Sequence, residues 1–146
     1  MDGLYARDAP TLGRAIQVGL AGDRVISVSF PETVPADADP DHPLLDRVFA
    51  YFDGAEDHFD DVEVALTVPT EQRTVLEAAR NVPYGETIGV SRLAKLAGLD
   101  DDADDLDAVR AALRENPVPL FIPDHRIEGP GATPPAVAER LRDVEA

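Results

Sequence analysis

The feature that most constrains the fold is a short apolar run, residues 118–122, enclosed by prolines in the stretch NPVPLFIPDHRIEGPG at positions 116–131. A run of this length, with proline on both sides, is typical of a buried strand. It is followed directly by Pro123, Asp124, His125 and Arg126. The pattern predicts a buried strand that delivers its last residues to a surface or a pocket.

Length and hydropathy define the class of protein. The chain has 146 residues, of which 44% are hydrophobic, and this suffices for one domain or two small ones. No apolar stretch approaches the roughly 18 residues of a membrane span, and the beginning, MDGLYARDAP, lacks the apolar segment of a signal peptide. We therefore expect a soluble, cytoplasmic protein, monomeric and without membrane association.

Composition excludes several kinds of chemistry. The sequence has no Cys, so disulfides, thiolate chemistry and Cys-ligated metals are excluded. With only three His residues, we expect neither a zinc site nor any other metal, and no cofactor. The run DDDADDLD, residues 100–107, begins like a calcium loop, but Asp105 stands where such a loop needs glycine.

The charge is strongly negative. Lys and Arg number 13 against 29 Asp and Glu, which gives a formal net charge of -16, and Lys95 is the sole lysine. Hydrated carboxylates keep a protein dissolved in molar salt, where a Debye length of about 3 Å suppresses their mutual repulsion. The composition predicts a halophilic protein, with an acidic mesophilic protein as the alternative.

The first half has the pattern of a small α+β unit. Alternating apolar residues predict a hairpin over residues 15–30, with its turn at Gly22 and Asp23. A loop rich in Pro and Asp follows. Helical spacing then predicts a helix over 44–52, and alternation predicts a strand over 62–69.

The second half has the pattern of a helical triad. Thr70 is a candidate N-cap for a helix that Pro83 ends, and Ser91 for a short helix that Gly98 ends. A third helix is expected over about 103–114, so the segments together predict a helix-turn-helix unit. We expect domains at 1–68 and 69–146, whose formal charges are -10 (4 basic, 14 acidic) and -6 (9 basic, 15 acidic).

The segments VPYGETIGVSRLAKLAG and ALRENPVPLFIPDHRI resemble the alkylguanine-DNA alkyltransferases, the methylated-DNA-protein-cysteine methyltransferases, and their alkyltransferase-like relatives. The resemblance covers about residues 69–128. It implies an α+β fold: a small α/β N-terminal domain and a winged helix-turn-helix C-terminal domain that binds DNA and flips an alkylated guanine into a pocket. In that family a cysteine in a PCHR motif accepts the alkyl group irreversibly.

The resemblance places the family's catalytic relay on four residues of this chain. The acceptor cysteine falls on Asp124, its neighbouring histidine on His125, the asparagine that ties the active-site turn on Asn116, and the glutamate that orients the histidine on Glu145. Three of the four positions keep the family's residue type, and the nucleophile does not.

Other departures concern the handling of DNA. The family tyrosine that helps to rotate the nucleotide out aligns with Val90, and the arginine that fills the vacated stack aligns with Asp107. The loop after the active-site strand is shortened to GPGATPPA, residues 129–136. The residues expected at a DNA interface are Tyr84, Gly85, Val90, Ser91, Arg92, Lys95, Asp107, Arg110, Arg114 and Arg126, whose basic members could equally pair with surrounding carboxylates.

These observations leave three functions open. An alkyltransferase-like protein would recognise alkylated guanine in double-stranded DNA without cysteine-dependent transfer and could recruit a repair partner. A second possibility is a degenerate structural or protein-interaction module that does not bind DNA. The third is weak dealkylation by Asp124, although a hard carboxylate is a poor substitute for a polarisable thiolate in displacement at carbon. The reader of alkylated DNA is the expectation we carry forward, and methyltransferase activity is not expected.

Overall fold

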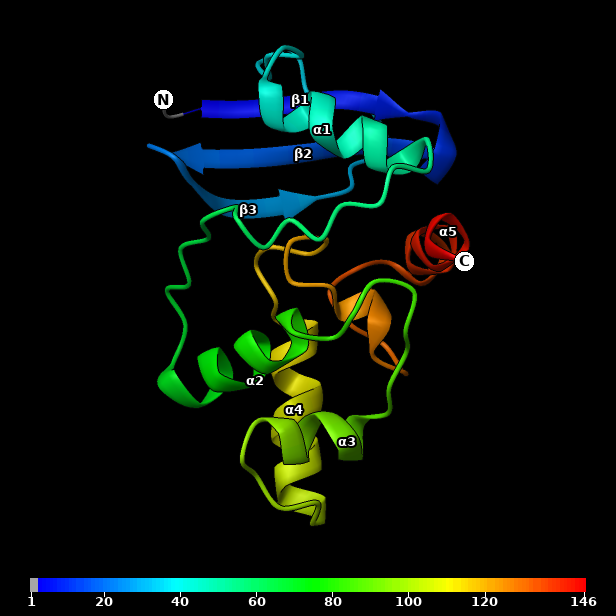
Figure 1. Ribbon diagram of the computed structural model, residues 1–146. Coiled ribbons are helices and arrows are strands. Elements are labelled where there is room, and N and C mark those ends of the chain that lie inside the picture. Colours follow the sequence, from blue (N-terminus) through cyan, green and yellow to red (C-terminus); the bar gives the residue numbers. More distant parts are fainter. Residues whose placement is uncertain (1–2) are drawn as a thin grey trace.

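The computed structural model describes residues 3–146 and shows a sheet packed beside a helical unit. In Figure 1 the three-stranded sheet and α1 (Pro43–Phe52) lie at one end, and α2 (Thr70–Arg80), α3 (Val90–Leu96) and α4 (Ala103–Arg114) lie at the other. The C-terminal helix α5 (Pro135–Glu145) contacts α1 and the 3-10 turns η1 (Pro10–Leu12) and η2 (Asp124–Arg126). The predicted α+β class is confirmed.

The sheet is an antiparallel meander of β1 (Gly3–Ala9), β2 (Arg14–Ala21) and β3 (Arg24–Ser29). The predicted hairpin is β2 and β3, whose turn places Gly22 at a left-handed φ of 63°. The sequence pattern missed β1. Within β1 the adjacent residues Tyr5 and Ala6 are both buried, so burial along this strand does not alternate with the two-residue period that marks a strand in a sequence.

The segment between α1 and α2 departs from the prediction. The expected strand over 62–69 is wrong, because the segment makes a single bridge, between Val64 and Val25 of β3. Val25 N donates to Glu63 O at 2.9 Å and Ala65 N donates to Val25 O at 2.9 Å, and the ladder goes no further. The residues are extended and pack Val62 and Leu66 inward without forming a strand.

The three helices of the triad form as predicted, with different caps. Thr70 is the first residue of α2 and Pro69 precedes it without a side-chain cap, while Gly89 rather than Ser91 occupies the N-cap of α3. In α4 the acidic run supplies the cap, because Asp102 Oδ1 accepts a hydrogen bond from Asp105 N at 2.9 Å. The wing of this helix-turn-helix unit is reduced to one bridge, Ile88 to Ile127.

The apolar run at 118–122 is buried as expected but is not a strand. Leu120 has a left-handed φ of 77°, and Ile122 N donates to Val118 O at 3.0 Å, so the run folds back on itself. Pro119 removes one backbone donor from the run, and Pro117 and Pro123 remove the donors on either side of it, which opposes a ladder. The tight turn carries the chain directly into η2, and this places Asp124 and His125 inside the protein.

A continuous apolar core joins the two halves. Phe59 packs edge-on against Tyr51 of α1 at 5.4 Å between ring centroids and against Phe121 at 5.3 Å. All three rings belong to one cluster of buried residues that extends from the sheet to α5. Across residues 3–146, none of the helices combines the length and apolarity that crossing a bilayer requires.

The α4 cap can be tested directly. We predict that Asp102→Ala lowers the free energy of unfolding by about 1 kcal/mol, because the Asp105 amide loses its acceptor. Urea denaturation in molar salt measures the change. Asp101→Ala is the matched control, since its exposed carboxylate lies 3.7 Å from Lys95 and caps nothing; an equal loss in both variants would contradict the assigned cap.

Candidate functional site

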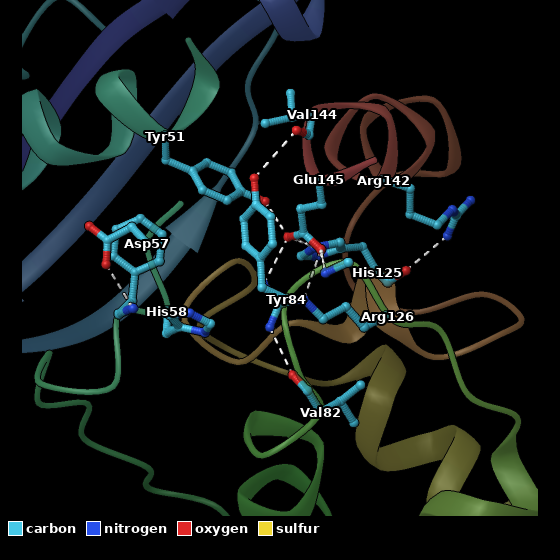
Figure 2. A network of polar contacts seen from close by, with 12 residues as sticks. Tyr51, Asp57, His58, Val82, Tyr84, His125, Arg126, Arg142, Val144 and Glu145 are labelled. Atoms are coloured by element: carbon cyan, nitrogen blue, oxygen red, sulfur yellow. Dashed lines mark hydrogen bonds and ion pairs between the residues drawn. The ribbon is translucent and has the colours of Figure 1, made fainter. Parts of the chain in front are cut away.

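The centre of the site is the buried carboxylate of Glu145, near the end of α5. It accepts hydrogen bonds from His125 Nε2 at 2.8 Å, from Arg126 Nε at 2.9 Å and Nη2 at 2.8 Å, and from Gly85 N at 3.2 Å. Tyr51 of α1 donates its hydroxyl to the same group. Figure 2 shows the side chains of Tyr51, His125 and Arg126 converging on this carboxylate. With the Gly85 amide, the donors come from three separate segments of the chain.

This network fixes protonation states. Burial alone would raise the pKa of Glu145, but hydrogen bonds from His125 and Arg126 and the charge beside it hold that pKa well below the ordinary value. Burial, together with the Glu145 charge, raises the pKa of the Tyr51 hydroxyl, which therefore stays a donor. Because a carboxylate only accepts, His125 Nε2 carries the proton, and in the neutral ring Nδ1 is then an acceptor.

The prediction that Arg126 contacts DNA is wrong, because the structure buries this residue. Its side chain is only 6% exposed, it pairs with Glu145, and its Nη1 donates to Val82 O at 2.9 Å. The guanidinium also lies over the Tyr84 ring, 5.7 Å from the centroid. The sequence predicted Arg126 beside the helix-turn-helix unit, either as a phosphate contact or as a partner of a carboxylate. The structure pairs its charge with Glu145 inside the protein, so it is not available to a phosphate.

Asp124 lies beside this network and is itself buried, with 2% of its surface exposed. Its Oδ2 accepts from Asn116 Nδ2 at 3.0 Å and from Thr133 N at 3.3 Å. Asn116 also donates to Ile122 O at 3.0 Å and accepts from Val118 N at 3.1 Å. Asn116 therefore ties the turn before η2 to the Asp124 carboxyl group.

Burial raises the pKa of Asp124, and hydrogen bonds from Thr133 and Asn116 offset only part of the effect. The carboxyl group is also tightly covered. A Cβ at position 131 would stand 2.9 Å from Asp124 Cγ, so only glycine fits there. These two properties favour the neutral acid and limit its access to an incoming carbon.

Three buried polar atoms of the site have no hydrogen-bond partner: Asp124 Oδ1, His125 Nδ1 and Thr133 Oγ1. Their residues line a cavity of about 340 Å³, which continues along Gly131 and Ala138. This volume lies at the lower end of the range for small-molecule sites. Unsatisfied polar atoms in a cavity are costly unless water or a ligand meets them, so the cavity is suited to a polar occupant.

The predicted DNA-contacting residues divide into two groups. Ser91, Arg92 and Lys95 on α3 and Arg110 and Arg114 on α4 are exposed. Lys95 and Arg110 lie near carboxylates, at 3.7 Å from Asp101 and 3.2 Å from Asp107, whereas within residues 3–146 Arg92 and Arg114 have no ion pair. Exposed pairs of this kind are weak, so all four cations stay accessible.

The other predicted contacts lie nearer the site. Val90 is half-buried at the start of α3, and Asp107 is exposed on α4. Tyr84 is half-buried against the network and its hydroxyl donates to Val144 O at 3.4 Å. Gly85 has a φ of 80°, and its amide donates a hydrogen bond to the buried Glu145 carboxylate.

Sequence reasoning missed Tyr51, Thr133 and Gly131. Tyr51 is 94 residues from its partner Glu145, and in the sequence it is one apolar position of an amphipathic helix. Thr133 and Gly131 lie in the shortened loop, where no periodic pattern marks a residue as buried. The single signal available was the presence of Gly and Thr within a loop that follows the relay.

The Glu145 network generates a stability prediction. We expect Glu145→Gln to lower the free energy of unfolding by about 3–5 kcal/mol at neutral pH, because Arg126 is left buried without its counter-charge. Glu139→Gln, exposed on the same helix, should change it by less than about 0.5 kcal/mol. Denaturant titration of both variants measures the difference.

The contribution of Glu145 to the free energy of unfolding depends on pH in a defined direction. Since the folded-state pKa of Glu145 lies below the unfolded one, its contribution is complete above the unfolded pKa and is lost as pH falls through the folded pKa. The gap between wild type and Glu145→Gln should therefore narrow on acidification. A gap that widened in acid would contradict the ionised assignment.

Asp124 has the opposite dependence, because its folded pKa is raised. Its contribution is most favourable below the unfolded pKa and is lost as pH rises through the folded pKa. We predict that Asp124→Asn gains stability relative to wild type as pH rises, measured by thermal unfolding over a pH series. A constant difference across that range would show that Asp124 does not titrate differently in the two states.

Comparison with known proteins agrees with this geometry. Residues 70–139 match the family model described as the DNA-binding domain of 6-O-methylguanine DNA methyltransferase. Methylated-DNA–protein-cysteine methyltransferases of Metallosphaera sedula and Methanopyrus kandleri are 31% and 33% identical over 84 and 86 residues, 58% and 59% of this chain. The matched segments span 51% and 62% of those two proteins, so the chain aligns with about half to three fifths of their length.

Solved structures extend the likeness to the whole fold. The crystal structure of a variant of Mycobacterium tuberculosis OGT superposes with a TM-score of 0.81 at 24% identity, over 99% of this chain and 93% of that one. A crystal structure of M. tuberculosis OGT in complex with DNA gives a TM-score of 0.75 at 25% identity, over 97% and 89%. The likeness in sequence to the DNA-binding domain of 6-O-methylguanine DNA methyltransferase thus lies in residues 70–139, and the likeness in fold extends beyond them.

Proposed function

We propose that this protein binds DNA and recognises alkylated guanine as an alkyltransferase-like reader, without transferring the alkyl group. The observation that carries the proposal is the retention of the relay around a position that has lost its nucleophile. His125 is hydrogen-bonded to Glu145, Asn116 is hydrogen-bonded to Asp124, and Asp124 and His125 line the same cavity. That arrangement supports a preserved pocket rather than a decayed one.

The chemistry at Asp124 supports recognition over transfer. Acceptance of an alkyl group needs an activated nucleophile, and in the family's scheme that group is a thiolate. Asp124 is biased towards the neutral acid, and Gly131 covers its carboxyl group. A neutral, covered carboxyl group is a poor nucleophile but a competent hydrogen-bonding wall for a bound base.

The DNA-binding role is supported by the helix-turn-helix unit and the family match, and the acidic surface sets its conditions. Arg92 and Arg114 are exposed and unpaired within the described chain, while aspartates crowd the turn before α4. In dilute buffer these carboxylates repel phosphates, and molar salt screens the repulsion along with the attraction. Affinity would then depend on packing, backbone amides and the cavity.

The test is a titration with duplexes that do and do not contain O6-methylguanine, in about 2–3 M KCl, where screening is strong. We expect the damaged duplex to bind at least about tenfold more tightly, equivalent to about 1.4 kcal/mol. Equal, negligible binding of both would exclude the reader and favour a protein-interaction module that has kept the fold.

A variant that fills the cavity beside Asp124 tests whether the alkylated base is recognised there. Ala138 lines the cavity from α5, so Ala138→Leu should remove the preference for the damaged duplex and leave binding of undamaged duplex unchanged. Ala136→Leu, exposed on the same helix, is the matched control and should keep the preference. A preference that survives in Ala138→Leu would place lesion recognition outside this cavity.

A further inference from the structure

A second, larger cavity lies away from the relay, between α2, the start of β3 and residues 64–67. Its volume is about 550 Å³. We call it the junction cavity. Arg24, Arg73 and Arg80 line it, and Glu77 is the single acidic residue among its lining residues. In a chain of net charge -16, this is a local concentration of positive charge.

The two arginines of α2 are seven residues apart, so they lie on one face of the helix. Arg73 donates through Nη2 to Leu66 O, and Arg80 donates through Nη2 to Phe59 O at 2.7 Å and to Val62 O. These bonds tie the extended segment before α2 to the helix. They use one nitrogen of each guanidinium group. Their acceptors are neutral carbonyl groups, so they do not neutralise the charge of either arginine.

Arg80 keeps unused binding capacity. Its Nε is buried without an acceptor, although a guanidinium offers five N–H donors. Within residues 3–146, no carboxylate lies within 4.0 Å of Arg73 or Arg80, whereas Arg24 lies 3.7 Å from the exposed Glu63. Burial lowers the pKa of Arg80, and the negative charges of Asp60 and Asp61 offset only part of this effect.

We propose that the junction cavity is a binding site for a small-molecule oxyanion of the phosphate-monoester type. Guanidinium groups match the planar geometry of phosphate oxygens and bind them as charge-assisted hydrogen bonds. The cavity is larger than a bare phosphate needs, and Val64, Ala65 and Leu66 add an apolar wall for an organic group. No lining residue comes from α3 or α4, and the three arginines of the cavity are not among the residues proposed to read DNA; Ile122 is the lining residue nearest to Asp124.

The test follows the Arg side-chain Nε–H signals of the full chain by ¹H–¹⁵N NMR during titration with two probes, inorganic phosphate and phenyl phosphate. The Arg80 signal should shift and saturate with either probe, and tighter binding of phenyl phosphate would assign the apolar wall to the ligand's organic group. Equal binding of the two probes would assign the site to the phosphate ion itself. No saturable shift with either probe overturns the proposal.

Variants that remove a positive charge and a variant that removes a negative charge should change the affinity in opposite directions, which distinguishes a binding site from a general loss of stability. Arg73→Gln should weaken the tighter probe by about tenfold, the effect of losing roughly 1.4 kcal/mol. Glu77→Gln should tighten it several-fold by removing the one repulsive charge, and Arg140→Gln on α5 should leave it unchanged. Because Arg80 holds two carbonyl groups, Arg24→Gln serves as the second weakening variant; unchanged affinity in Arg73→Gln, Arg24→Gln and Glu77→Gln together would refute the site.

Discussion

The structure depends on one buried carboxylate, that of Glu145, and on the donors that make its burial tolerable. Isolated in an apolar interior, the group would cost several kcal/mol. Here α1 supplies Tyr51, the turn before α3 supplies the Gly85 amide, and η2 supplies His125 and Arg126. Because the donors come from both halves of the chain, the carboxylate can be satisfied only when the sheet unit and the helical unit are docked.

The same docking explains how the residues around position 124 stay in place although that position holds an aspartate. His125 and Arg126 are held by Glu145 from one side, and Asn116 holds the turn from the other. None of these bonds requires a thiol at position 124. Asp124 fits because Asn116 and Thr133 N satisfy one oxygen, while the other oxygen stays unpaired beside the cavity.

Sequence patterns predicted the elements that depend mainly on neighbouring residues. The hairpin and the helices α1, α2, α3 and α4 were predicted from apolar spacing and turn or cap residues. The pairing of His125 with Glu145 was predicted only through the resemblance to a known family. Two segments were not predicted correctly. Within residues 3–146, residues 62–69 bridge to the sheet only at Val25 and so form no strand, and Leu120 turns the apolar run back on itself. The burial of Arg126 was hidden because its partner lies in another helix.

We propose that the cavity beside His125 still admits an alkylated base and that Asp124, at the position of the family's acceptor, does not take up the alkyl group. Mass spectrometry of Asp124→Cys and of wild type, after incubation with duplex containing O6-methylguanine in molar salt, tests it most directly. The account predicts one added methyl group on Cys at position 124, with wild-type protein unmodified and its DNA still methylated. Loss of the methyl group from DNA with wild type, or an unmodified Asp124→Cys protein that is folded, would contradict it.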